Sequence, residues 1–495
     1  MQRQDTELAA ALLAGETSGE LFVRAGEAEP ERMLAALGRA MEQPELAAAP
    51  ELWLPDLYVA ARPAFGLEAL VGLVNAYREH CGRPLDLRSR RALPRVLGSS
   101  NFLARTLARE PSWADELENR SGNPTDDRDS VPFPAAPERG APPPDWGEIR
   151  KTKYRGLLRI AARDLSGRPL RASLHELSDL ADDCLAAGVE CASEEKGAEV
   201  PSLFALGKLG GRELNLSSDV DLLFLYDGPG GEAGLARNRE VAGIARALRQ
   251  GLEHGSPQGF AYRVDLELRP EGKSGSLANS VDGALSYYES FGAEWERQAL
   301  VRLRHVAGAP AAARAFEAGI EPFVYRRSIS PDTLGAVREM KHRIERERRS
   351  AGRDIEHDLK EGPGGIRDIE FLVQALQLLF GGRDRSVRTG NVLDALEALA
   401  AADALPEPIA GSLAAAYTWL RRAEHAIQLA EERQTHQFPR DPEAQLALAR
   451  RLGDRDTSGK VARTRLLEEW TATRTEVRAH FDRILPESNA GEAAG

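Results

Sequence analysis

The segment LFALGKLGGRELNLSSDVDLLFLYD at 203–227 constrains the fold most, because the helical spacing of apolar residues before it changes there to short apolar runs. Residues 202–206 and 220–226 are two such runs, bounded by glycine, serine and charge, and they predict strands. A third run follows at 261–268, after a helical pattern at 239–254. Strand, loop, strand, helix and strand in this order predict a small mixed α/β unit.

Helical sequence flanks this unit on both sides. Alanine, leucine, glutamate and arginine recur there at helical spacing, as in LEALVGLVNAYREH at 67–80. Proline, glycine and charge dominate 119–147, which predicts an exposed linker. We therefore expect a predominantly helical α+β chain. Its predicted parts are an N-terminal helical region at 1–118, the linker at 119–147, a sheet-bearing domain at 148–330, a helical bundle at 331–486 and a disordered tail at 487–495.

The charge balance narrows the choice of partners. The 495 residues carry 65 Lys and Arg against 77 Asp and Glu, a net charge of −12, whereas a nucleic-acid-binding domain is usually basic. The N-terminus contains acidic residues and no long apolar core, so it does not read as a signal peptide. No apolar run reaches the roughly 18 residues of a membrane span. We expect a cytoplasmic protein with neither a nucleic-acid nor a membrane partner.

Asp219 and Asp221 open the second predicted strand. Alternate side chains of a strand share a face, so both carboxylates point the same way while Val220 points into the core. A divalent cation holds two adjacent carboxylates ionised, and phosphate chemistry uses such a cation. The plain alternative is a solvated acidic strand start, and Asp-x-Asp alone does not exclude it.

The surrounding residues favour phosphate chemistry. The loop before Asp219 contains Gly207, Gly210 and Gly211, whose backbone N–H groups can approach phosphates closely. Its spacing matches neither the Walker A loop nor the dinucleotide fingerprint. Strand alternation in the third run predicts Asp265 and Arg269 on one face, together with Glu267. Three carboxylates from two strands can bind two Mg²⁺ ions, and Arg269 can neutralise phosphate oxygens.

These motifs resemble those of known proteins. A glycine-containing loop, then Asp-hydrophobic-Asp, then a third carboxylate on a later strand resembles the polymerase-beta-like nucleotidyltransferase superfamily. Longer segments are similar to the glutamine synthetase adenylyltransferase and adenylyl-removing enzyme family. They are GKLGGRELNLSSDVDLLF, VDLELRPEGKSGSLANS at 264–280, WERQALVRLRHVAG at 295–308 and DLKEGPGGIRDIEFLVQALQLLFGGRD at 358–384, with weaker likeness at 96–111 and 159–165.

The resemblance implies a fold, an activity and a set of site residues. The expected fold is a polymerase-beta-like nucleotidyltransferase domain flanked by helical regions. The expected enzyme transfers AMP from ATP to a tyrosine of glutamine synthetase, or removes it by phosphorolysis, and so regulates nitrogen assimilation. Mg²⁺ is the implied cofactor, with ATP or phosphate as co-substrate. The implied catalytic and metal-binding residues are Asp219, Asp221 and Asp265, and the implied nucleotide-binding residues are Gly207, Lys208, Gly210, Gly211, Ser218 and Arg269.

The sequence departs from the family pattern at two positions and carries one catalytic module where full-length members carry two. Lys208 stands where the superfamily usually has Gly or Ser, and Glu267 stands where the family often has Arg. The role of Glu267 therefore stays open. So does the direction of AMP transfer, with a slight preference for the adenylyl-removing module. Glutamine synthetase is the implied protein substrate and the PII signal protein a further partner.

Two other functions compete with this one. A non-catalytic regulator would dock glutamine synthetase or PII through its helices, but it has no need for three clustered acids. A small-molecule nucleotidyltransferase would need less helical docking surface.

Three weaker features complete the expectations. His357 and Asp358 form a His-Asp dipeptide, which we interpret as structural because a third histidine and a distant aspartate are not apparent. Arg367 and Glu370 lie three apart on one helix face and could pair with each other, while the resemblance implies a role in bracing or closing the nucleotide site as the alternative. Arg302 and Arg304 are candidates to line the same cleft as the aspartates.

Overall fold

The computed structural model describes residues 29–118, 145–228, 231–256, 259–327, 332–454, 456 and 458–485. The predicted tail at 487–495 and most of the predicted linker lie outside these residues. Trp146 and Gly147, at the end of the predicted linker, already belong to a helix. The chain divides into two compact units. Unit 1 is Met1–Pro132, Arg155–Ser173 and Arg421–Ala472, and unit 2 is Phe133–Tyr154, Leu174–Leu420 and Thr473–Gly495. The domain boundaries stay a prediction.

Unit 1 is built from helices. Its centre is the 19-residue helix α6 (Pro63–Cys81), whose buried side chains include Leu67, Leu70 and Val74. The helix begins with a proline and ends at Gly82, which has the left-handed conformation that glycine adopts readily. The other elements of the 29–118 region are α3 (Pro30–Met41), α4 (Pro44–Ala47), η1 (Pro50–Leu52), α5 (Leu54–Tyr58), α7 (Leu93–Ser99), α8 (Asn101–Arg109) and η2 (Pro111–Leu117). Helix α20 (Pro442–Arg451) belongs to the same unit.

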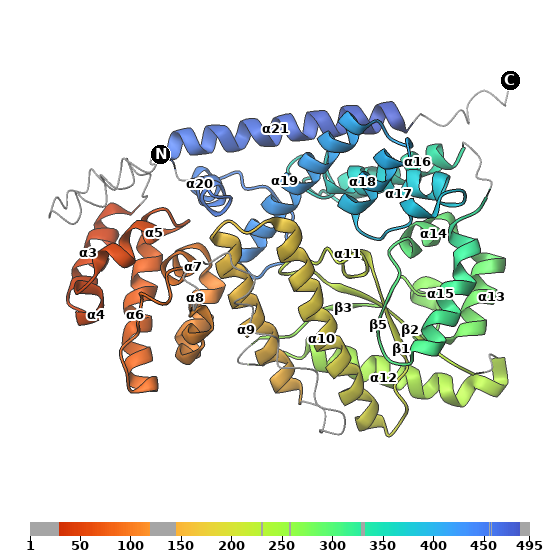
Figure 1. Ribbon diagram of the computed structural model, residues 1–495, viewed down its shortest axis with the longest axis horizontal. Helices are drawn as coiled ribbons and strands as arrows, with labels where there is room; N and C mark the ends of the chain where they lie inside the picture. Colours follow the sequence, from red (N-terminus) through yellow and green to blue (C-terminus); the bar gives the residue numbers. More distant parts are fainter. Residues whose placement is uncertain are drawn as a thin grey trace. The chain divides into compact units, whose positions relative to one another are not determined.

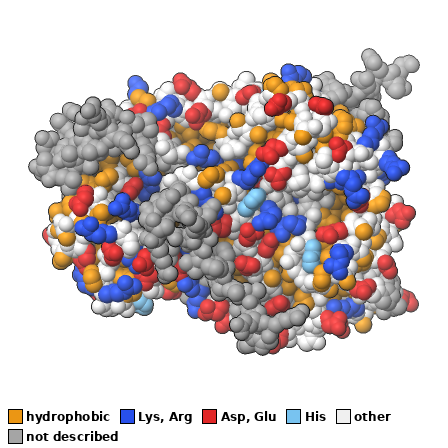
Figure 2. All heavy atoms as spheres, in the orientation of Figure 1, with side chains coloured by type: hydrophobic (Ala, Val, Ile, Leu, Met, Phe, Trp, Pro, Cys, Tyr) orange, Lys and Arg blue, Asp and Glu red, His pale blue; other side chains and the backbone are white. Residues whose placement is uncertain are grey.

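Four long helices contribute residues to both units. They are α9 (Trp146–Leu165), α10 (Leu170–Lys196), α19 (Glu407–Glu431) and α21 (Gly459–Ile484). With the helices of both units, they make the chain predominantly helical, as predicted (Figure 1). No helix among the described residues combines the length and the apolar character that crossing a membrane requires. On the face drawn in Figure 2, acidic and basic side chains are interspersed.

Unit 2 contains a small mixed sheet of five strands within the described residues, in the order β3-β2-β1-β5 with β4 also beside β2. Strands β1 (Ser202–Leu206) and β2 (Val220–Tyr226) have the predicted bounds and pair antiparallel. Strands β3 (Val264–Asp265) and β4 (Ala278–Ser280) both run parallel to β2, at its start and its end. Strand β5 (Arg304–Ala307) pairs antiparallel with β1. The α+β prediction with a small mixed sheet is confirmed.

The third predicted strand is much shorter than expected. The run 261–268 forms a strand only at Val264–Asp265, and the chain turns immediately afterwards. The turn is held by Arg269, whose guanidinium donates hydrogen bonds to the carbonyl oxygens of Leu266, Lys273, Gly275 and Ser276. The strand alternation predicted for this run therefore ends at Asp265, although Asp265, Glu267 and Arg269 all line one cavity.

Helices pack against the sheet and bury its central strands. Phe204 of β1 and Leu223 and Leu225 of β2 share a core with α13 (Val281–Phe291) and α15 (Pro310–Val324), which lie beside the sheet in Figure 1. Both faces of β1 are buried, which explains why this strand is a continuous apolar run. Asp221 and Asp219 lie two and four residues before Leu223, so the face that packs on these helices becomes acidic at its end.

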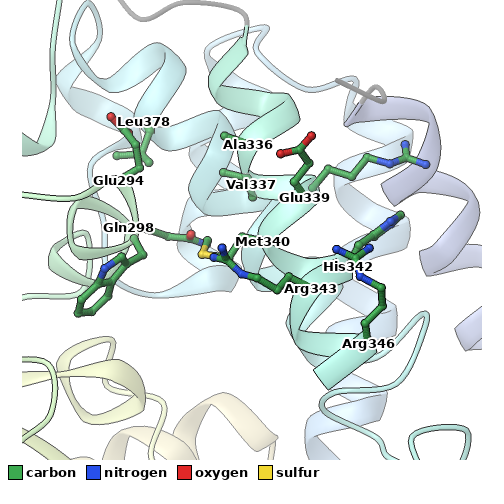
Figure 3. A pocket seen from close by; sticks show the side chains of 12 residues that line it. Glu294, Gln298, Ala336, Val337, Glu339, Met340, His342, Arg343, Arg346 and Leu378 are labelled. Carbon is green, nitrogen blue, oxygen red and sulfur yellow. The ribbon is translucent and has the colours of Figure 1, made fainter. Parts of the chain in front are cut away.

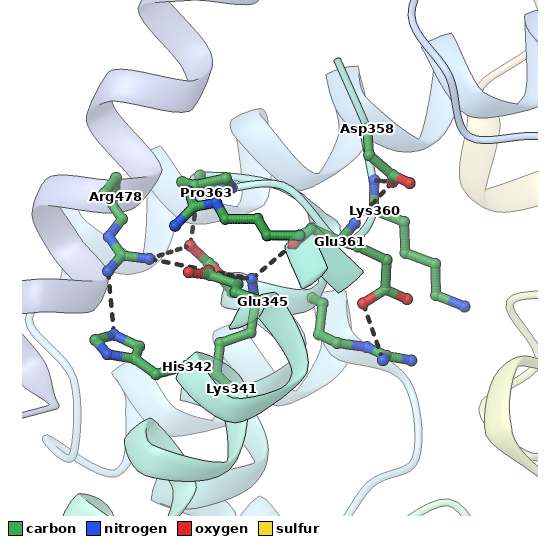
Figure 4. Close-up of polar contacts among 12 residues, drawn as sticks. Lys341, His342, Glu345, Asp358, Lys360, Glu361, Pro363 and Arg478 are labelled. Carbon is green, nitrogen blue, oxygen red and sulfur yellow. Dashed lines mark hydrogen bonds and ion pairs between the residues drawn. The ribbon is translucent and has the colours of Figure 1, made fainter. Parts of the chain in front are cut away.

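The remaining elements of unit 2 are mostly helical. They are α11 (Gly207–Gly210), η4 (Gly231–Gly234), α12 (Leu235–Glu253), η5 (Gly272–Ser274), α14 (Glu294–Leu300), α16 (Asp332–Ser350), α17 (Ile366–Gly381), η6 (Arg385–Val387) and α18 (Val392–Ala401). Buried ion pairs connect α16, α17 and the loop between them. Lys341 is fully buried and pairs with Glu345 and Asp368, while its ammonium also donates to the carbonyl of Glu361 (Figure 4).

Candidate active site

The sheet register brings the predicted carboxylates together. Asp221 of β2 lies directly opposite Asp265 of β3, because the two strands pair in parallel with Val220 beside Val264. Asp219 precedes Asp221 by two residues and therefore projects from the same face. The three aspartates come from one edge of the sheet, at the start of β2.

The glycine-rich loop lies against Asp221. Gly207 opens the one-turn helix α11 directly after β1, with a φ of +55°. A Cβ atom at this position would lie 2.1 Å from Oδ2 of Asp221, so the backbone and the carboxylate can approach this closely only at glycine. The same helix carries Lys208, whose positive charge acts on Asp221. The loop residues expected from the resemblance thus adjoin the expected catalytic aspartate.

The electrostatics of Asp221 reflect this crowding. The pKa of Asp221 is raised to about 6, mainly by burial and also by the neighbouring charges of Asp265 and Asp219, against the lowering effect of Lys360 and Lys208. Asp221 is difficult to ionise beside two other carboxylates, and a bound cation would stabilise its ionised form. Lys360 lies in the loop before α17, so the helical part of unit 2 also influences the carboxylates.

The carboxylates of Asp219 and Asp265 have partners within the protein. Arg263 donates from Nε to Oδ1 of Asp219 at 2.5 Å and from Nη2 to the carbonyl of Ser217 at 2.7 Å. Oδ1 of Asp265 accepts the backbone N–H of Glu267 at 2.7 Å. Within the described ranges, no three His, Cys, Asp or Glu side chains are placed so that they could hold a metal ion. Asp219, Asp221 and Asp265 carry the carboxylate oxygens that Mg²⁺ prefers, but a Mg²⁺ site here would require their side chains to move, with Asp219 turning away from Arg263.

A small cavity adjoins these residues. Its volume is about 300 Å³. Its walls carry both carboxylates and cations, among them Asp219, Asp265, Arg249, Arg263 and Lys273. Lys273 pairs with Glu267 at 3.1 Å. This mixture suits a phosphate group and its counter-ion better than an apolar ligand.

Two predicted nucleotide-binding residues have structural hydrogen bonds. The hydroxyl of Ser218 accepts the N–H of Asn215 at 3.3 Å, within the loop that leads into β2. The Arg269 side chain is buried and bonded to the carbonyl oxygens of its own turn, as described above. Contact of Ser218 or Arg269 with nucleotide stays a prediction. Glu267 lies in this turn and pairs with Lys273.

The two candidate arginines brace the glycine-rich loop from behind. Arg304 makes a bidentate ion pair with Asp182 of α10 and donates to the carbonyl oxygens of Leu209 and Gly210. The carbonyl of Arg302 lies where a Cβ atom at position 210 would be, only 1.8 Å away. Both arginines therefore fix the position of the loop.

A buried ion-pair cluster extends this support and was missed in the sequence. The Arg302 side chain contacts Glu370 of α17 at 3.2 Å and Glu213 at 3.4 Å, and all three are buried. Glu213 also accepts the N–H of Val392 and the hydroxyl of Tyr417. The two acidic neighbours raise the pKa of Arg302, against the opposing effect of its burial. In the sequence, Glu213 stands out only as an acidic residue between the glycines of the loop and two leucines.

The predicted Arg367–Glu370 pair does not form. Arg367 pairs instead with Glu361 at 3.0 Å, and Glu370 turns to Arg302. His357 contacts Asp354 of its own turn, and the Asp358 carboxylate accepts the N–H groups of Lys360 and Glu361. The structural interpretation of this dipeptide agrees with these contacts.

A small mixed sheet with three aspartates at one edge, beside a glycine-rich loop, defines a polymerase-beta-like nucleotidyltransferase fold. Comparison with known proteins identifies the family. The model of the family "Glutamate-ammonia ligase adenylyltransferase" matches residues 91–319, and that of "GlnD PII-uridylyltransferase" matches residues 337–485. Residues 91–319 thus match the glutamate-ammonia ligase adenylyltransferase family, as the resemblance predicted.

Curated relatives extend the likeness over most of the chain. Each is named bifunctional glutamine synthetase adenylyltransferase/adenylyl-removing enzyme. The protein of Thioalkalivibrio sulfidiphilus is 36% identical over 92% of this chain and 47% of its own length. That of Xanthomonas campestris is 36% identical over 79% of this chain and 42% of its own length, and that of Nitrosococcus oceani is 38% identical over 68% and 36%. The chain thus spans less than half the length of these relatives.

Proposed function

We propose that this chain is an adenylyl-transferring module that acts on a tyrosine of glutamine synthetase. One observation carries the proposal: Asp221 and Asp265 are paired in register, with Asp219 on the same face and Gly207 against Asp221. The names of the relatives supply the substrate. Their two activities are the addition of AMP and its removal, and both fit one site because the reacting atom is the α-phosphorus in each direction.

In the proposed mechanism Asp219, Asp221 and Asp265 would hold Mg²⁺, and the ion would neutralise phosphate oxygens and polarise the reacting group. Asp219 and Asp221 would serve the nucleotide side of the site, and Asp265 the side of the attacking oxygen. In the adding direction the tyrosine oxygen attacks the α-phosphorus and pyrophosphate leaves, with Asp265 assisting removal of the phenolic proton. In the removing direction phosphate attacks, ADP forms and the tyrosine regains its proton.

The loop residues position the phosphates in this proposal. The backbone of Gly207, Gly210 and Gly211 approaches them, and Lys208 supplies a positive charge beside Asp221. Arg302 and Arg304 act indirectly by fixing the loop. Ser218 and Arg269 are retained as proposed nucleotide contacts on the resemblance alone. The proposed domain boundaries are those given from the sequence, with catalysis at 148–330.

The helical region after 331 is proposed to contact the PII signal protein. Its match to the PII-uridylyltransferase family model at 337–485 supports this role. PII should then bind the chain without altering metal affinity at the aspartates. Loss of PII binding after substitutions in the sheet, but not in this region, would contradict the assignment.

The main test presents both substrates to the protein. Unmodified glutamine synthetase is incubated with ATP and Mg²⁺, and adenylylated glutamine synthetase with phosphate and Mg²⁺. Mass spectrometry of the tyrosine peptide shows which direction occurs, and the proposal predicts a change in at least one arm. No change in either arm, with a matched glutamine synthetase, would overturn it.

Two controls separate the competing functions. The double variant Asp219→Asn/Asp221→Asn should lose the reaction, whereas a non-catalytic regulator would keep its cellular effect. A parallel screen of small alcohols with ATP tests a small-molecule nucleotidyltransferase. Modification of an alcohol in preference to glutamine synthetase would favour that alternative.

A further inference from the structure

A second cavity lies away from the aspartates, between α14 and α16. It has a volume of about 750 Å³, within the range of small-molecule sites. It is lined by Leu378 of α17 and by Trp295 and Gln298 of α14, and Figure 3 labels Leu378 and Gln298. It shares no lining residue with the cavity beside Asp219 and Asp265. The two cavities are therefore separate candidate sites.

Helix α16 divides its charges between two faces. Lys341 and Glu345 form the buried ion pairs that attach the helix to α17. Met340, Arg343 and Arg346 follow helical spacing on the face that lines the cavity. Figure 3 shows Arg343 and Arg346 extending from α16 into the cavity. Arg338 and His342 also line the cavity and contact Asp482 and Arg478 of α21, whereas Arg343 and Arg346 take no part in attaching α16 to another described helix.

The two cavity arginines are available for a ligand. Both side chains are exposed, and no hydrogen bond or ion pair joins either guanidinium to another residue in the described part of the chain. Arg338, by contrast, is bonded to Asp482 and to the carbonyl of Leu485. Two acidic residues line the cavity: Glu294 on the opposite wall pairs with Arg297 at 2.9 Å, and Glu339 lies on α16 with the two arginines. Free guanidinium groups three residues apart are suited to binding a phosphate.

The opposite wall offers a surface for a planar group. The Trp295 side chain keeps 39% of its surface exposed, which is unusual for an indole that could pack in the core. Beside it, Gln298 is buried and fixed by a hydrogen bond from its amide nitrogen to Gln374 at 2.7 Å. A flat ring can stack on the indole with its polar edge toward this held amide.

From this arrangement we propose that the cavity is a non-catalytic binding site for a mononucleotide. The phosphate lies between Arg343 and Arg346, and the base stacks on Trp295. An inorganic anion would use the arginines but leave most of the cavity unfilled. The inference is independent of the proposed function, because no residue of the carboxylate site takes part.

The test is equilibrium binding of radiolabelled ADP to the full chain in EDTA. Without a divalent cation the three aspartates repel phosphate, so binding reports the second cavity. We expect one ADP bound per chain, and Arg343→Ala/Arg346→Ala should weaken binding by roughly tenfold or more for each arginine. The double variant Arg314→Ala/Arg383→Ala removes two exposed arginines outside the cavity and should leave ADP binding unchanged.

Trp295 distinguishes a nucleotide from a simple anion. Trp295→Ala should weaken ADP binding by roughly fivefold or more, and Trp295→Phe should keep most of it. Inorganic phosphate should compete only at far higher concentration than ADP. Absence of cation-independent ADP binding, or binding that survives Arg343→Ala/Arg346→Ala, would overturn the proposal. Equal competition by phosphate with no effect of Trp295→Ala would also overturn it.

Discussion

Replacement of Gly207 by alanine tests the contact between the glycine-rich loop and Asp221. The added Cβ atom would lie 2.1 Å from Oδ2 of Asp221, whereas real Cβ contacts are essentially never below 3.0 Å. The loop and the carboxylate must therefore separate by at least 0.9 Å, the difference between these distances. The φ of +55° adds roughly 1 to 2 kcal/mol of backbone strain for alanine.

A displacement of about 1 Å at a catalytic group can reduce the rate by roughly 100-fold, and this is the loss we expect. The assay is turnover of glutamine synthetase in whichever direction the wild-type protein works, with thermal unfolding measured in parallel. Gly243→Ala is the matched control: Gly243 lies within α12 with nothing near its Cβ position, so alanine there should preserve activity and stability. Wild-type turnover by Gly207→Ala would refute the reasoning.

Three further predictions concern charges around the site. The pKa of Asp221 is raised to about 6, and a metal ion needs the ionised carboxylate, so Mn²⁺ affinity measured by electron paramagnetic resonance should fall as the pH drops below about 6. Without metal the folded protein favours the protonated carboxyl, so its stability should fall as the pH rises from about 4 to 6. Lys360→Ala should move both midpoints upward, and unchanged midpoints would contradict the charge assignment. Arg263→Ala removes the cation paired with Asp219, so calorimetry should show Mn²⁺ binding tightened by about two- to fivefold, and weaker binding would count against competition at this carboxylate. Glu213→Ala leaves the buried Arg302 without one partner and should lower the free energy of unfolding in urea by about 3 kcal/mol or more, whereas a loss below about 1 kcal/mol would show that Glu370 alone suffices.

The strands that could be predicted are those whose side chains are almost all buried. The runs at 202–206 and 220–226 are apolar except for Ser202 and Asp221, and the structure keeps their bounds. The third strand was predicted too long because the apolar alternation continues past Asp265. In the structure the Arg269 side chain donates hydrogen bonds to backbone carbonyl oxygens and so holds this segment in a turn. A side chain that binds four backbone groups overrides a local strand preference, and nothing in the alternation reveals it.

In the candidate site, too, contacts within one strand could be predicted, whereas contacts between residues far apart in the sequence could not. Asp219 and Asp221 follow from the spacing of one strand, and the pairing of Asp221 with Asp265 follows once the strands are parallel neighbours. The Arg263–Asp219 ion pair and the Glu213–Arg302–Glu370 cluster depend on residues up to 157 positions apart, from 370 − 213, so the sequence alone did not locate them. Whether these residues bind metal and nucleotide stays a prediction.

Asp219, Asp221 and Asp265 are proposed to transfer AMP to or from glutamine synthetase. The most direct measurement compares wild-type protein with Asp221→Asn, which keeps the shape of the side chain but removes its charge. Mass spectrometry follows the tyrosine peptide in both reaction arms, with Mg²⁺ present. The account predicts a change by the wild-type protein and a rate at least roughly 100-fold lower for Asp221→Asn. Equal rates for the two proteins would contradict it.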